Sequence, residues 1–286
     1  GILGQREPVA GDNIILTIDK NLQEVAQKAL EGKRGAIVVL DPENGDVLAL
    51  AASPTFDPNI FTKYLSPEKF REVSGRPGRP FFNRAVAGLY PPASTFKIVV
   101  ASAALEKGVI KPGTVWTVNN GEHLNLIEAL AYSSDPFFYR LGEALGVDNI
   151  AWFSRRFGLG ARTGIDLPYE QKGLVPDRGS KKTWYRGDID NISIGQGAWQ
   201  VTPLQMADLI AAVANGGKIY RPRIVREIVS PAGKIIKSFP VQLRGELPVS
   251  KANLDVVRKG LLEVVRIGTG RRARMNTVEV AGKTGT

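Results

Sequence analysis

The stretch Tyr90-Pro-Pro-Ala-Ser-Thr-Phe-Lys97 joins a pair of prolines to the start of a predicted helix and contains a serine three residues before a lysine. Its prolines interrupt any preceding regular structure, and the apolar run that follows predicts a helix over residues 94–107. On a helix, positions i and i+3 share a face, so the Ser94 hydroxyl and the Lys97 amine can meet. This spacing makes Ser94 a candidate nucleophile and Lys97 its candidate base.

The chemistry of such a pair makes two demands on the surrounding structure. A serine hydroxyl becomes a nucleophile only with a neighbouring base. Lys97 can be that base only if burial or a nearby cation lowers its pKa below the free value of ~10.4. A helix start also helps Ser94, because backbone N–H groups there stabilise developing negative charge. Alone, the same residues equally fit a capping serine beside a surface lysine.

A second polar motif, Ser133-Ser-Asp135, lies between two apolar helical stretches and is followed by a proline. It predicts a short interhelical loop that turns toward something polar. By itself it also fits a simpler interpretation, in which Ser134 or Asp135 only caps the next helix.

A third motif, Lys283-Thr-Gly-Thr286, follows an apolar run that predicts a strand over residues 277–282. A glycine there lets a ligand approach the strand edge, and a lysine with two hydroxyls suits a carboxylate. Taken alone, the motif also fits a basic strand end.

Taken together, the three motifs occur in the order that is typical of penicillin-recognising serine enzymes. Beyond them, the chain resembles the elongation-type class B penicillin-binding proteins nearly from end to end. The further segments that carry this resemblance are Leu16-Thr-Ile-Asp19, Phe56-Asp-Pro-Asn59, Asn83-Arg84, Ser193-Ile-Gly-Gln-Gly197, Thr202-Pro-Leu-Gln205, Ala214-Asn-Gly-Gly217 and Gly268-Thr-Gly270.

The resemblance implies a peptidoglycan D,D-transpeptidase that is a target of β-lactams. Ser94 would attack the D-Ala–D-Ala bond of a donor stem peptide and form an acyl-enzyme, which an acceptor amine then resolves as a cross-link. Lys97 would take the proton of Ser94, and Asp135 would hold Lys97 in place. Ser133, helped by Lys283, would relay a proton to the leaving D-alanine.

The resemblance also implies how the substrate is held. Thr284 and Thr286 would bind the terminal carboxylate, with Gly285 allowing close approach. Backbone N–H groups of Ser94 and Thr286 would form the oxyanion hole.

No metal or organic cofactor is implied. The implied partners are peptidoglycan stem peptides, β-lactams, a glycosyltransferase and elongation-complex proteins. The implied location is the bacterial cell membrane, with the catalytic domain on its outer, periplasmic side. We also expect C-terminal strands and a helix, an N-terminal pedestal and the membrane anchor to lie outside this sequence, so that this chain acylates more slowly than one extended past Thr286.

Three departures from the family pattern stand out. Asp135 occupies a position that is often Asn, although elongation-type members use Asp there. Ala93 replaces a common Gly, from which we expect only a small change in backbone freedom. Some relatives carry zinc before the second motif, but this chain has no cysteine and a single histidine, His123, so we predict no zinc.

Around the motifs, the pattern of apolar runs and turn residues predicts an α+β fold. Apolar runs at 36–40 and 47–51 flank an Asn-Gly turn, and those at 223–230 and 234–239 flank Pro231-Ala-Gly; both predict hairpins. Helices are expected at 20–31, 204–214 and 250–266, whereas 53–80 is expected to be an ordered surface excursion. We therefore expect the penicillin-binding transpeptidase (serine β-lactamase-like) fold as one domain, 1–286, with an antiparallel sheet flanked by helices and an all-helical subdomain at about 94–215.

The amino-acid composition further narrows the kinds of site and binding partner that fit this chain. The absence of cysteine excludes disulfides, thiolate catalysis and cysteine-bound metals. The net charge of +10 lies wholly in residues 216–286, with 15 Lys and Arg against 5 Asp and Glu. Such a segment suits an anionic polymer or lipid, or is a solvated face whose acidic partners lie beyond Thr286. Its arginines lack interleaved aromatic residues, so we expect no nucleic acid. No apolar run approaches the ~20 residues of a membrane span.

Three other functions share these motifs. A D-alanine carboxypeptidase has all three, and the sequence separates it poorly from a transpeptidase. The segment around Ser94 also resembles that of class D β-lactamases, but Asp135 replaces their apolar third residue. A non-enzymatic β-lactam sensor or scaffold is the remaining alternative, and intact Ser94, Lys97 and Lys283 argue against an idle scaffold.

Overall fold

The elements of the chain come from a computed structural model, which describes residues 9–62, 64–118 and 121–286. The helices are α1 Lys20–Ala29, η1 Pro58–Phe61, α2 Pro67–Ser74, α3 Arg84–Ala87, η2 Ala93–Phe96, α4 Lys97–Glu106, α5 Leu126–Ala131, α6 Asp135–Arg156, η4 Arg178–Ser180, α7 Arg186–Ser193, α8 Pro203–Ala214, α9 Lys251–Arg266 and η5 Arg271–Ala273. The strands are β1 Asn13–Leu16, β2 Gly35–Leu40, β3 Val47–Ser53, β4 Trp116–Thr117, β5 His123–Leu124, β6 Lys218–Tyr220, β7 Val225–Val229, β8 Ile235–Ser238 and β9 Leu243–Glu246.

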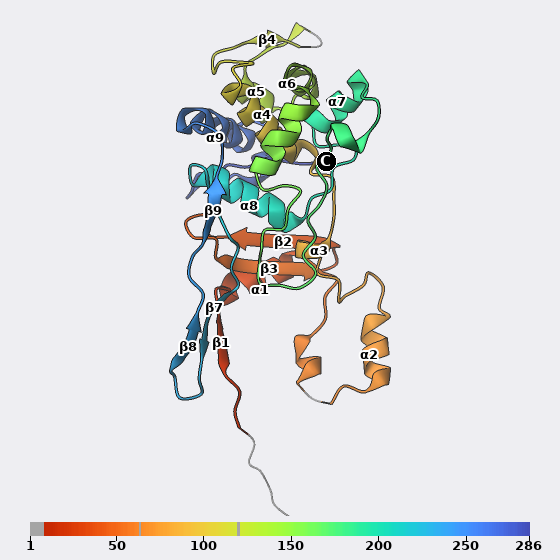
Figure 1. Ribbon diagram of the computed structural model, residues 1–286, viewed down its shortest axis with the longest axis vertical. Coiled ribbons are helices and arrows are strands. Elements are labelled where there is room, and N and C mark those ends of the chain that lie inside the picture. The colour runs from red at the N-terminus through yellow and green to blue at the C-terminus, as the bar shows by residue number, and fades with distance from the viewer. Residues whose placement is uncertain (1–8, 63, 119–120) are drawn as a thin grey trace, which may run out of the picture.

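The elements form a helical layer above small antiparallel sheets (Figure 1). Helices α4, α5, α6 and α9 gather at one end of the long axis, and α8 lies between them and the β2–β3 hairpin. The strands β1, β7 and β8 form a ribbon that extends away from the helices, and α2 belongs to a separate lobe. The α+β class predicted from the sequence is thus confirmed.

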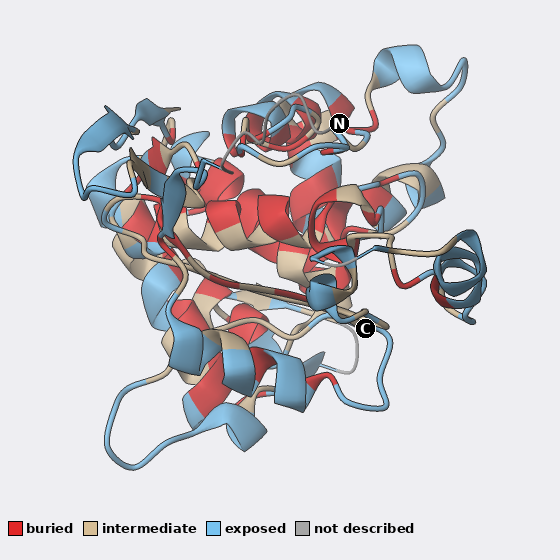
Figure 2. Ribbon diagram, turned by 90° about the horizontal axis from the view of Figure 1, so that it is seen from below, coloured by how far each residue is buried: buried red, intermediate tan, exposed pale blue. Residues whose placement is uncertain are grey.

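Helix α4 forms the centre of the largest hydrophobic core. Every residue from Lys97 to Leu105 is buried and, apart from Lys97 and Ser102, apolar, as expected for a helix enclosed by other helices. Figure 2 shows the buried residues gathered in the middle of the molecule, with exposed segments around them. Residues of α5, α6, α8 and α9 pack against it. Because α4 begins at Lys97, this core fixes the position of that lysine.

The β2–β3 hairpin has the register that its turn predicts. Asp41 and Asn44 side chains accept backbone N–H groups within the turn, and Gly45 has φ 79°, a left-handed conformation that favours glycine. Along β3, alternate residues Val47, Ala49 and Ala51 are buried, and the last two pack against α1. The buried carboxylate of Asp46 pairs with Arg223 at 2.7 Å and so ties this hairpin to the segment before β7.

Several other expected elements are also present. The β7–β8 hairpin and the helices α1, α8 and α9 occur where the pattern predicts them, within a few residues. Thr202 caps α8 in a capping box with Gln205, and Pro203 is its first residue. The surface excursion 53–80 contains helix α2, which the sequence did not indicate.

Two expectations about the sheet are corrected. The strands form one three-stranded sheet, β1-β7-β8, and three two-stranded ones in the described residues, not one split sheet. The expected strand at 277–282 is absent from the described structure: the backbone N–H of Gly282 donates to the carbonyl of Leu261 in α9, at 3.0 Å, and the segment pairs with no described strand. A strand exists only where a neighbouring strand completes its hydrogen bonds.

The expected helical block at 94–215 has one addition. It contains the short β4–β5 hairpin, with Trp116 opposite Leu124. Helix α9, which comes later in the chain, packs against α4 and α5 in the same core.

No helix in the described part of the chain is both long and apolar enough to cross a membrane.

Candidate active site

The three motifs, distant in sequence, meet around the Ser133 hydroxyl. Ser133 lies in the loop between α5 and α6, and its Oγ is 3.1 Å from Lys97 Nζ and 2.8 Å from Lys283 Nζ. Lys97 begins the central helix α4, whereas Lys283 comes from the segment after α9. The resemblance implied that Lys283 helps Ser133; in the structure the amines of both Lys97 and Lys283 contact the Ser133 hydroxyl.

Lys97 is fully buried and makes three polar contacts. Its ammonium donates to the Ser133 carbonyl at 2.8 Å, to Ser133 Oγ and to an Asp135 carboxylate oxygen. Burial lowers the pKa of Lys97, and the hydrogen bond and charge of Asp135 oppose this shift only in part. The structure therefore contradicts the simpler interpretation of a surface lysine.

Lys283 is a second lysine whose charge is disfavoured. Burial is the main cause, and the positive charge of Lys97 adds to it, so the pKa of Lys283 falls to about 8. Its amine donates to Ser133 Oγ and, at 3.1 Å, to the backbone carbonyl of Thr284. Near neutral pH this lysine remains mostly protonated but releases its proton far more easily than a free lysine.

The hydrogen bonds of Ser133 fix the direction of its own proton. A hydroxyl has two acceptor lone pairs and one donor hydrogen. Both lysines donate to this oxygen, so its hydrogen is left to point toward a third group. The residue has φ 56°, a left-handed conformation that costs a non-glycine residue about 1–3 kcal/mol and that clusters at functional sites.

Asp135 contacts Lys97 instead of acting only as a cap. It is the first residue of α6, and Ser134 at the cap position makes no side-chain capping bond. Its side chain is 46% exposed, whereas the lysine that it pairs with is buried. Asp135 thus supplies the negative charge that keeps a buried ammonium in place.

Ser94, the predicted nucleophile, is half-buried in the turn η2 that leads into α4. Among the described residues, no hydrogen bond connects its hydroxyl to Lys97, whose donors are used by Ser133 and Asp135. The spacing places both residues at the start of one helix, as predicted. The direct contact that we considered possible is not made, because the amine turns toward the second motif.

Ala93 has φ 49°, in the left-handed region that favours glycine. Its N–H donates to the Gly195 carbonyl at 2.9 Å, and a side chain at Gly195 would collide with the Ala93 carbonyl. An alanine in this conformation is disfavoured by about 1–2 kcal/mol. The replacement of glycine therefore strains the backbone next to Ser94, which is more than the small change we expected.

The segment 283–286 lies beside the turn that contains Ser94. A Cβ added to Gly285 would lie 3.3 Å from Thr95 Cγ2 and 3.4 Å from the Pro92 carbonyl, so this glycine is close to the turn. The Thr286 carbonyl accepts from Gln196 Nε2 at 3.1 Å. Of the predicted substrate-binding residues Thr284, Gly285 and Thr286, Gly285 thus lies close to the turn with Ser94, and the two threonines precede and follow it in the chain.

Two residues that hold this segment had no role in the sequence analysis. Gln196 holds Thr286, and the Thr269 hydroxyl is 2.8 Å from the Thr284 hydroxyl. The Thr269 N–H also donates to the Ala131 carbonyl at 3.1 Å, just before the Ser133 loop. Thr269 thus connects the second and third motifs, and the signal that could have found it is a threonine between two glycines, Gly268-Thr-Gly270.

Gly268 permits this connection. A Cβ at this position would lie 2.0 Å from the Ala131 carbonyl oxygen, which leaves no space for any side chain.

Within the described ranges, no group of three or more His, Asp and Glu side chains could hold a metal ion. The predicted absence of zinc stays a prediction.

Comparison with known proteins identifies the family to which these features belong. Residues 35–286 match the penicillin binding protein transpeptidase domain. The chain is 34% identical to a peptidoglycan D,D-transpeptidase MrdA of Acinetobacter baumannii, over 99% of this chain and 46% of that protein. It therefore spans about half the length of this curated relative.

Solved structures of other penicillin-binding proteins have the same fold as this chain. A structure of Pseudomonas aeruginosa PBP2 in complex with WCK 5153 superimposes with a TM-score of 0.84 at 35% identity, covering 96% of this chain and 68% of that one. A complex between PBP2 and MreC from Helicobacter pylori gives 0.83 at 31% identity, covering 95% of this chain and 54% of the other. These matches confirm the transpeptidase fold predicted from the three motifs: the chain belongs to the penicillin-binding protein transpeptidase domain family.

Proposed function

We propose that this chain is the catalytic domain of a peptidoglycan D,D-transpeptidase. The observation that carries the proposal is the Ser133 hydroxyl held between Lys97 and Lys283, beside the turn with Ser94. The family and the relatives named D,D-transpeptidase support the same reaction. Residues 1–286 would form one such domain, with its helical subdomain at about 94–215.

The reaction would begin at Ser94. Its Oγ attacks the carbonyl between the two D-alanines of a donor stem peptide, and Lys97 takes the hydroxyl proton. The three N–H groups of Lys97 are all engaged as an ammonium, so it must first release a proton. Burial, which lowers its pKa, makes that release less costly.

The leaving D-alanine would receive its proton from Ser133. Because both lone pairs of that hydroxyl accept from lysines, its hydrogen can be directed to the departing nitrogen. As the carbon–nitrogen bond breaks, Lys97 or Lys283 replaces the proton on Ser133. The acyl-enzyme then transfers to an acceptor amine, which forms the cross-link and frees Ser94.

Substrate binding would use the third motif. The Lys283 ammonium and the hydroxyls of Thr284 and Thr286 suit the terminal carboxylate, and Gly285 keeps the approach open. Backbone N–H groups of Ser94 and Thr286 would donate to the developing oxyanion. No cofactor is needed.

The test is a reaction with a donor stem pentapeptide and an acceptor amine, analysed by mass spectrometry. A transpeptidase yields the cross-linked product with release of D-alanine. Release of D-alanine without cross-linking would indicate a carboxypeptidase, and rapid turnover of penicillin would indicate a β-lactamase.

Partners and location are part of the proposal. The Helicobacter pylori PBP2 structure is a complex with MreC, which supports an elongation-complex protein as a partner of the whole protein. A glycosyltransferase and β-lactams would be further partners. The location would be the bacterial cell membrane, with this domain on the outer side.

Replacing Thr269 by valine should slow acylation about 3–10-fold, since it removes one hydrogen bond to Thr284 worth about 0.5–1.5 kcal/mol. The second-order rate constant for a fluorescent penicillin measures this loss. Thr269→Ser keeps the hydroxyl and should restore most of the rate. Equal rates for the valine variant and the unchanged chain would mean that Thr284 is positioned without Thr269.

The pH dependence of acylation should show an alkaline fall that belongs to Lys283. The acylation rate should decrease above a pH of about 8 as Lys283 loses the charge that binds the carboxylate, whereas deprotonation of Lys97, whose pKa is lowered by burial, acts in the opposite direction. Acylation rate constants measured across this pH range show the fall. In Lys283→Arg the alkaline fall should move to much higher pH, because arginine keeps its charge. An unchanged alkaline limb in that variant would contradict the role of Lys283.

A further inference from the structure

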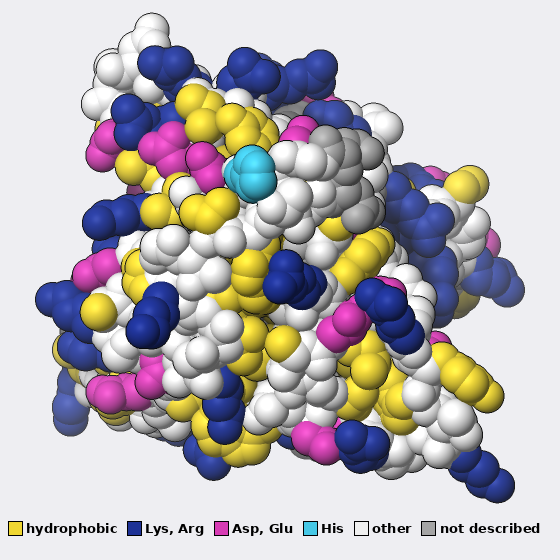
Figure 3. All heavy atoms as spheres, turned by 90° about the horizontal axis from the view of Figure 1, so that it is seen from above, with side chains coloured by type: hydrophobic (Ala, Val, Ile, Leu, Met, Phe, Trp, Pro, Cys, Tyr) yellow, Lys and Arg dark blue, Asp and Glu magenta, His cyan; other side chains and the backbone are white. Residues whose placement is uncertain are grey.

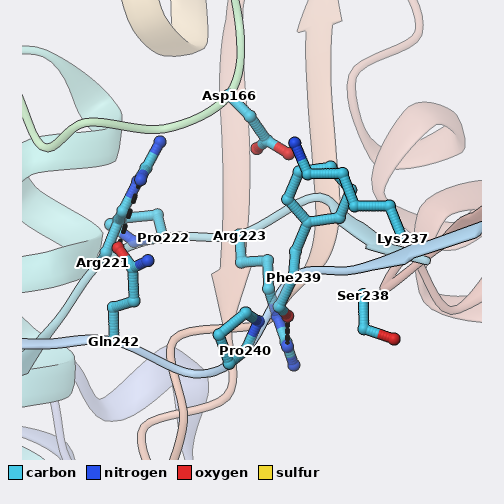
Figure 4. Close-up of a pocket in the computed structure, with 9 residues that line it drawn as sticks. All are labelled: Asp166, Arg221, Pro222, Arg223, Lys237, Ser238, Phe239, Pro240 and Gln242. Atoms are coloured by element: carbon cyan, nitrogen blue, oxygen red, sulfur yellow. Dashed lines mark hydrogen bonds between the residues drawn. The ribbon is translucent and has the colours of Figure 1, made fainter. Parts of the chain in front are cut away.

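A cleft of about 410 Å³ lies beside the β7–β8 hairpin. It is formed by three stretches distant from the active-site motifs: the loop with Asp166, the turn before β7, and the end of β8 with the residues after it (Figure 4). Its lining consists of Asp166, Arg221, Pro222, Arg223, Lys237, Ser238, Phe239, Pro240 and Gln242. The proposed catalytic chemistry uses none of these residues.

The single carboxylate in the lining already has its partners. The oxygens of Asp166 accept the backbone N–H groups of Ile224 and Val225, each at 3.1 Å. Arg223 is likewise committed, because it pairs with the buried Asp46 and donates to the Phe239 carbonyl. These contacts hold the walls of the cleft together. The positive charges that remain available to a ligand are those of the two other cations in the lining.

Those two cations are Arg221 and Lys237. Arg221 donates its Nε to the Gly164 carbonyl and one terminal nitrogen to Gln242 Oε1 at 3.2 Å, and its other terminal nitrogen has no partner in the described part of the chain. The Lys237 ammonium lies 4.8 Å from the centre of the Phe239 ring and pairs with no carboxylate among the described residues. Figure 4 shows Arg221 and Gln242 on one side of the cleft and Lys237 with Phe239 on the other.

The shape of the surroundings favours a polypeptide as the ligand. Strand β8 is the last strand of the sheet β1-β7-β8, so one side of its backbone is free of any described strand. Its residues Ile235 and Ile236 are 53% and 54% exposed. An open strand edge accepts an extended segment of another chain, and specificity then comes from side-chain pockets beside it.

The charge of the cleft favours one carboxylate over a polyanion. A nucleic acid or a lipid surface needs many cations, whereas the lining of this cleft leaves two, Arg221 and Lys237, to a ligand. On the helical end of the molecule, which Figure 3 shows, the Lys and Arg side chains are scattered among acidic and apolar ones. Asp166 also lines the cleft, and its negative charge reduces the net positive charge that the lining offers to a polyanion. A single Glu or Asp side chain between Lys237 and Arg221 matches what the lining offers.

We propose that the β8 edge and this cleft form a docking site for an extended acidic segment of a partner protein, whose carboxylate binds between Lys237 and Arg221. Ser238 and Gln242 supply uncharged hydrogen-bonding groups beside it. This site is independent of the acylation chemistry.

The probe for the test is a fluorescein-labelled peptide of alternating valine and glutamate, and its control replaces each glutamate with glutamine. Binding is followed by fluorescence anisotropy at physiological ionic strength, where charges more than about 8 Å apart are largely screened. The glutamate peptide should bind on the order of tenfold more tightly than the glutamine peptide.

Three variants locate the binding. Lys237→Glu should weaken binding of the glutamate peptide on the order of tenfold. Gln242→Glu, nearly the same shape, should occupy Arg221 with a carboxylate of the protein itself and also weaken binding. Lys234→Glu makes the same charge change on an exposed residue of the β7–β8 turn outside the cleft, and it should leave binding nearly unchanged.

The proposal is overturned if both peptides bind equally, or if Lys237→Glu and Lys234→Glu lose the same affinity. It is also overturned if neither peptide binds while vesicles containing phosphatidylglycerol bind in a Lys237-dependent way, which would indicate a membrane contact instead. Penicillin acylation serves as the folding control. It should be equal in all three variants, because none of them changes a residue of the candidate active site.

Discussion

Replacing Ser94 with alanine is expected to abolish acylation by penicillin, with a loss on the order of 10⁶-fold, comparable to that of removing the nucleophile in other serine enzymes. Alanine removes only the hydroxyl oxygen. The buried α4, the Lys97 contacts and the Ser133 loop do not depend on that oxygen, since the side chain of Ser94 makes no hydrogen bond among the described residues. The fold should therefore remain intact.

Intact mass after incubation with penicillin measures this result, and peptide mapping locates the adduct. The unchanged chain should gain one penicillin on the peptide that contains Ser94. Ser102→Ala is the matched control, because the hydroxyl of this buried serine of α4 donates to the Ile98 carbonyl and to no other group among the described residues. An adduct on Ser133 in place of Ser94 would refute the assignment of the nucleophile.

Replacing Lys97 with arginine should reduce acylation by about 10²–10⁴-fold, the range typical of a lost general base. Arginine keeps the positive charge but does not release its proton at any working pH, so it cannot accept one from Ser94. If Lys97 contributed only its positive charge, the Lys97→Arg variant would keep most of its acylation activity.

The buried position of Lys97 calls for a second variant. Its side chain is fully enclosed, so a larger guanidinium could disturb the core for reasons unrelated to proton transfer. Lys97→Met has a similar length without the charge, and the Asp135 carboxylate left behind is 46% exposed and can be hydrated. Thermal unfolding shows which variants stay folded. Near-normal acylation by a folded Arg or Met variant would contradict the role of Lys97 as base.

Local features of the sequence correctly predicted the hairpins β2–β3 and β7–β8 and the helices α1, α8 and α9. The Asn-Gly turn and the apolar runs beside it specify the β2–β3 hairpin through backbone conformations that only those residues favour. Thr202, Pro203 and Gln205 specify the start of α8 in the same way. Such signals act over a few residues, so they can be recognised without knowing the rest of the chain.

One exception depends on residues far away. The segment 277–282 has an apolar pattern, but its described neighbour is helix α9 and not a strand, so its conformation was decided by the available partners. The short helix α2 is a different case: its stretch of prolines and scattered apolar residues gave no clear period, but a local start signal is present, since Ser66 caps the helix and Pro67 is its first residue.

The candidate site shows the same difference between what local sequence signals predict and what long-range contacts decide. The sequence by itself predicted which residues form the candidate site, because the three motifs occur in an order that is typical of one family. Only the tertiary structure decided how they meet: the central position of α4 buries Lys97 and lowers its pKa, and Ser133 lies between two amines that are 186 positions apart, Lys97 and Lys283. It also assigned Thr269 and Gln196 their positions, since a hydrogen bond between distant residues leaves no local pattern in the sequence. Burial and long-range contact are properties of the whole packed chain, which is why no single segment could reveal them.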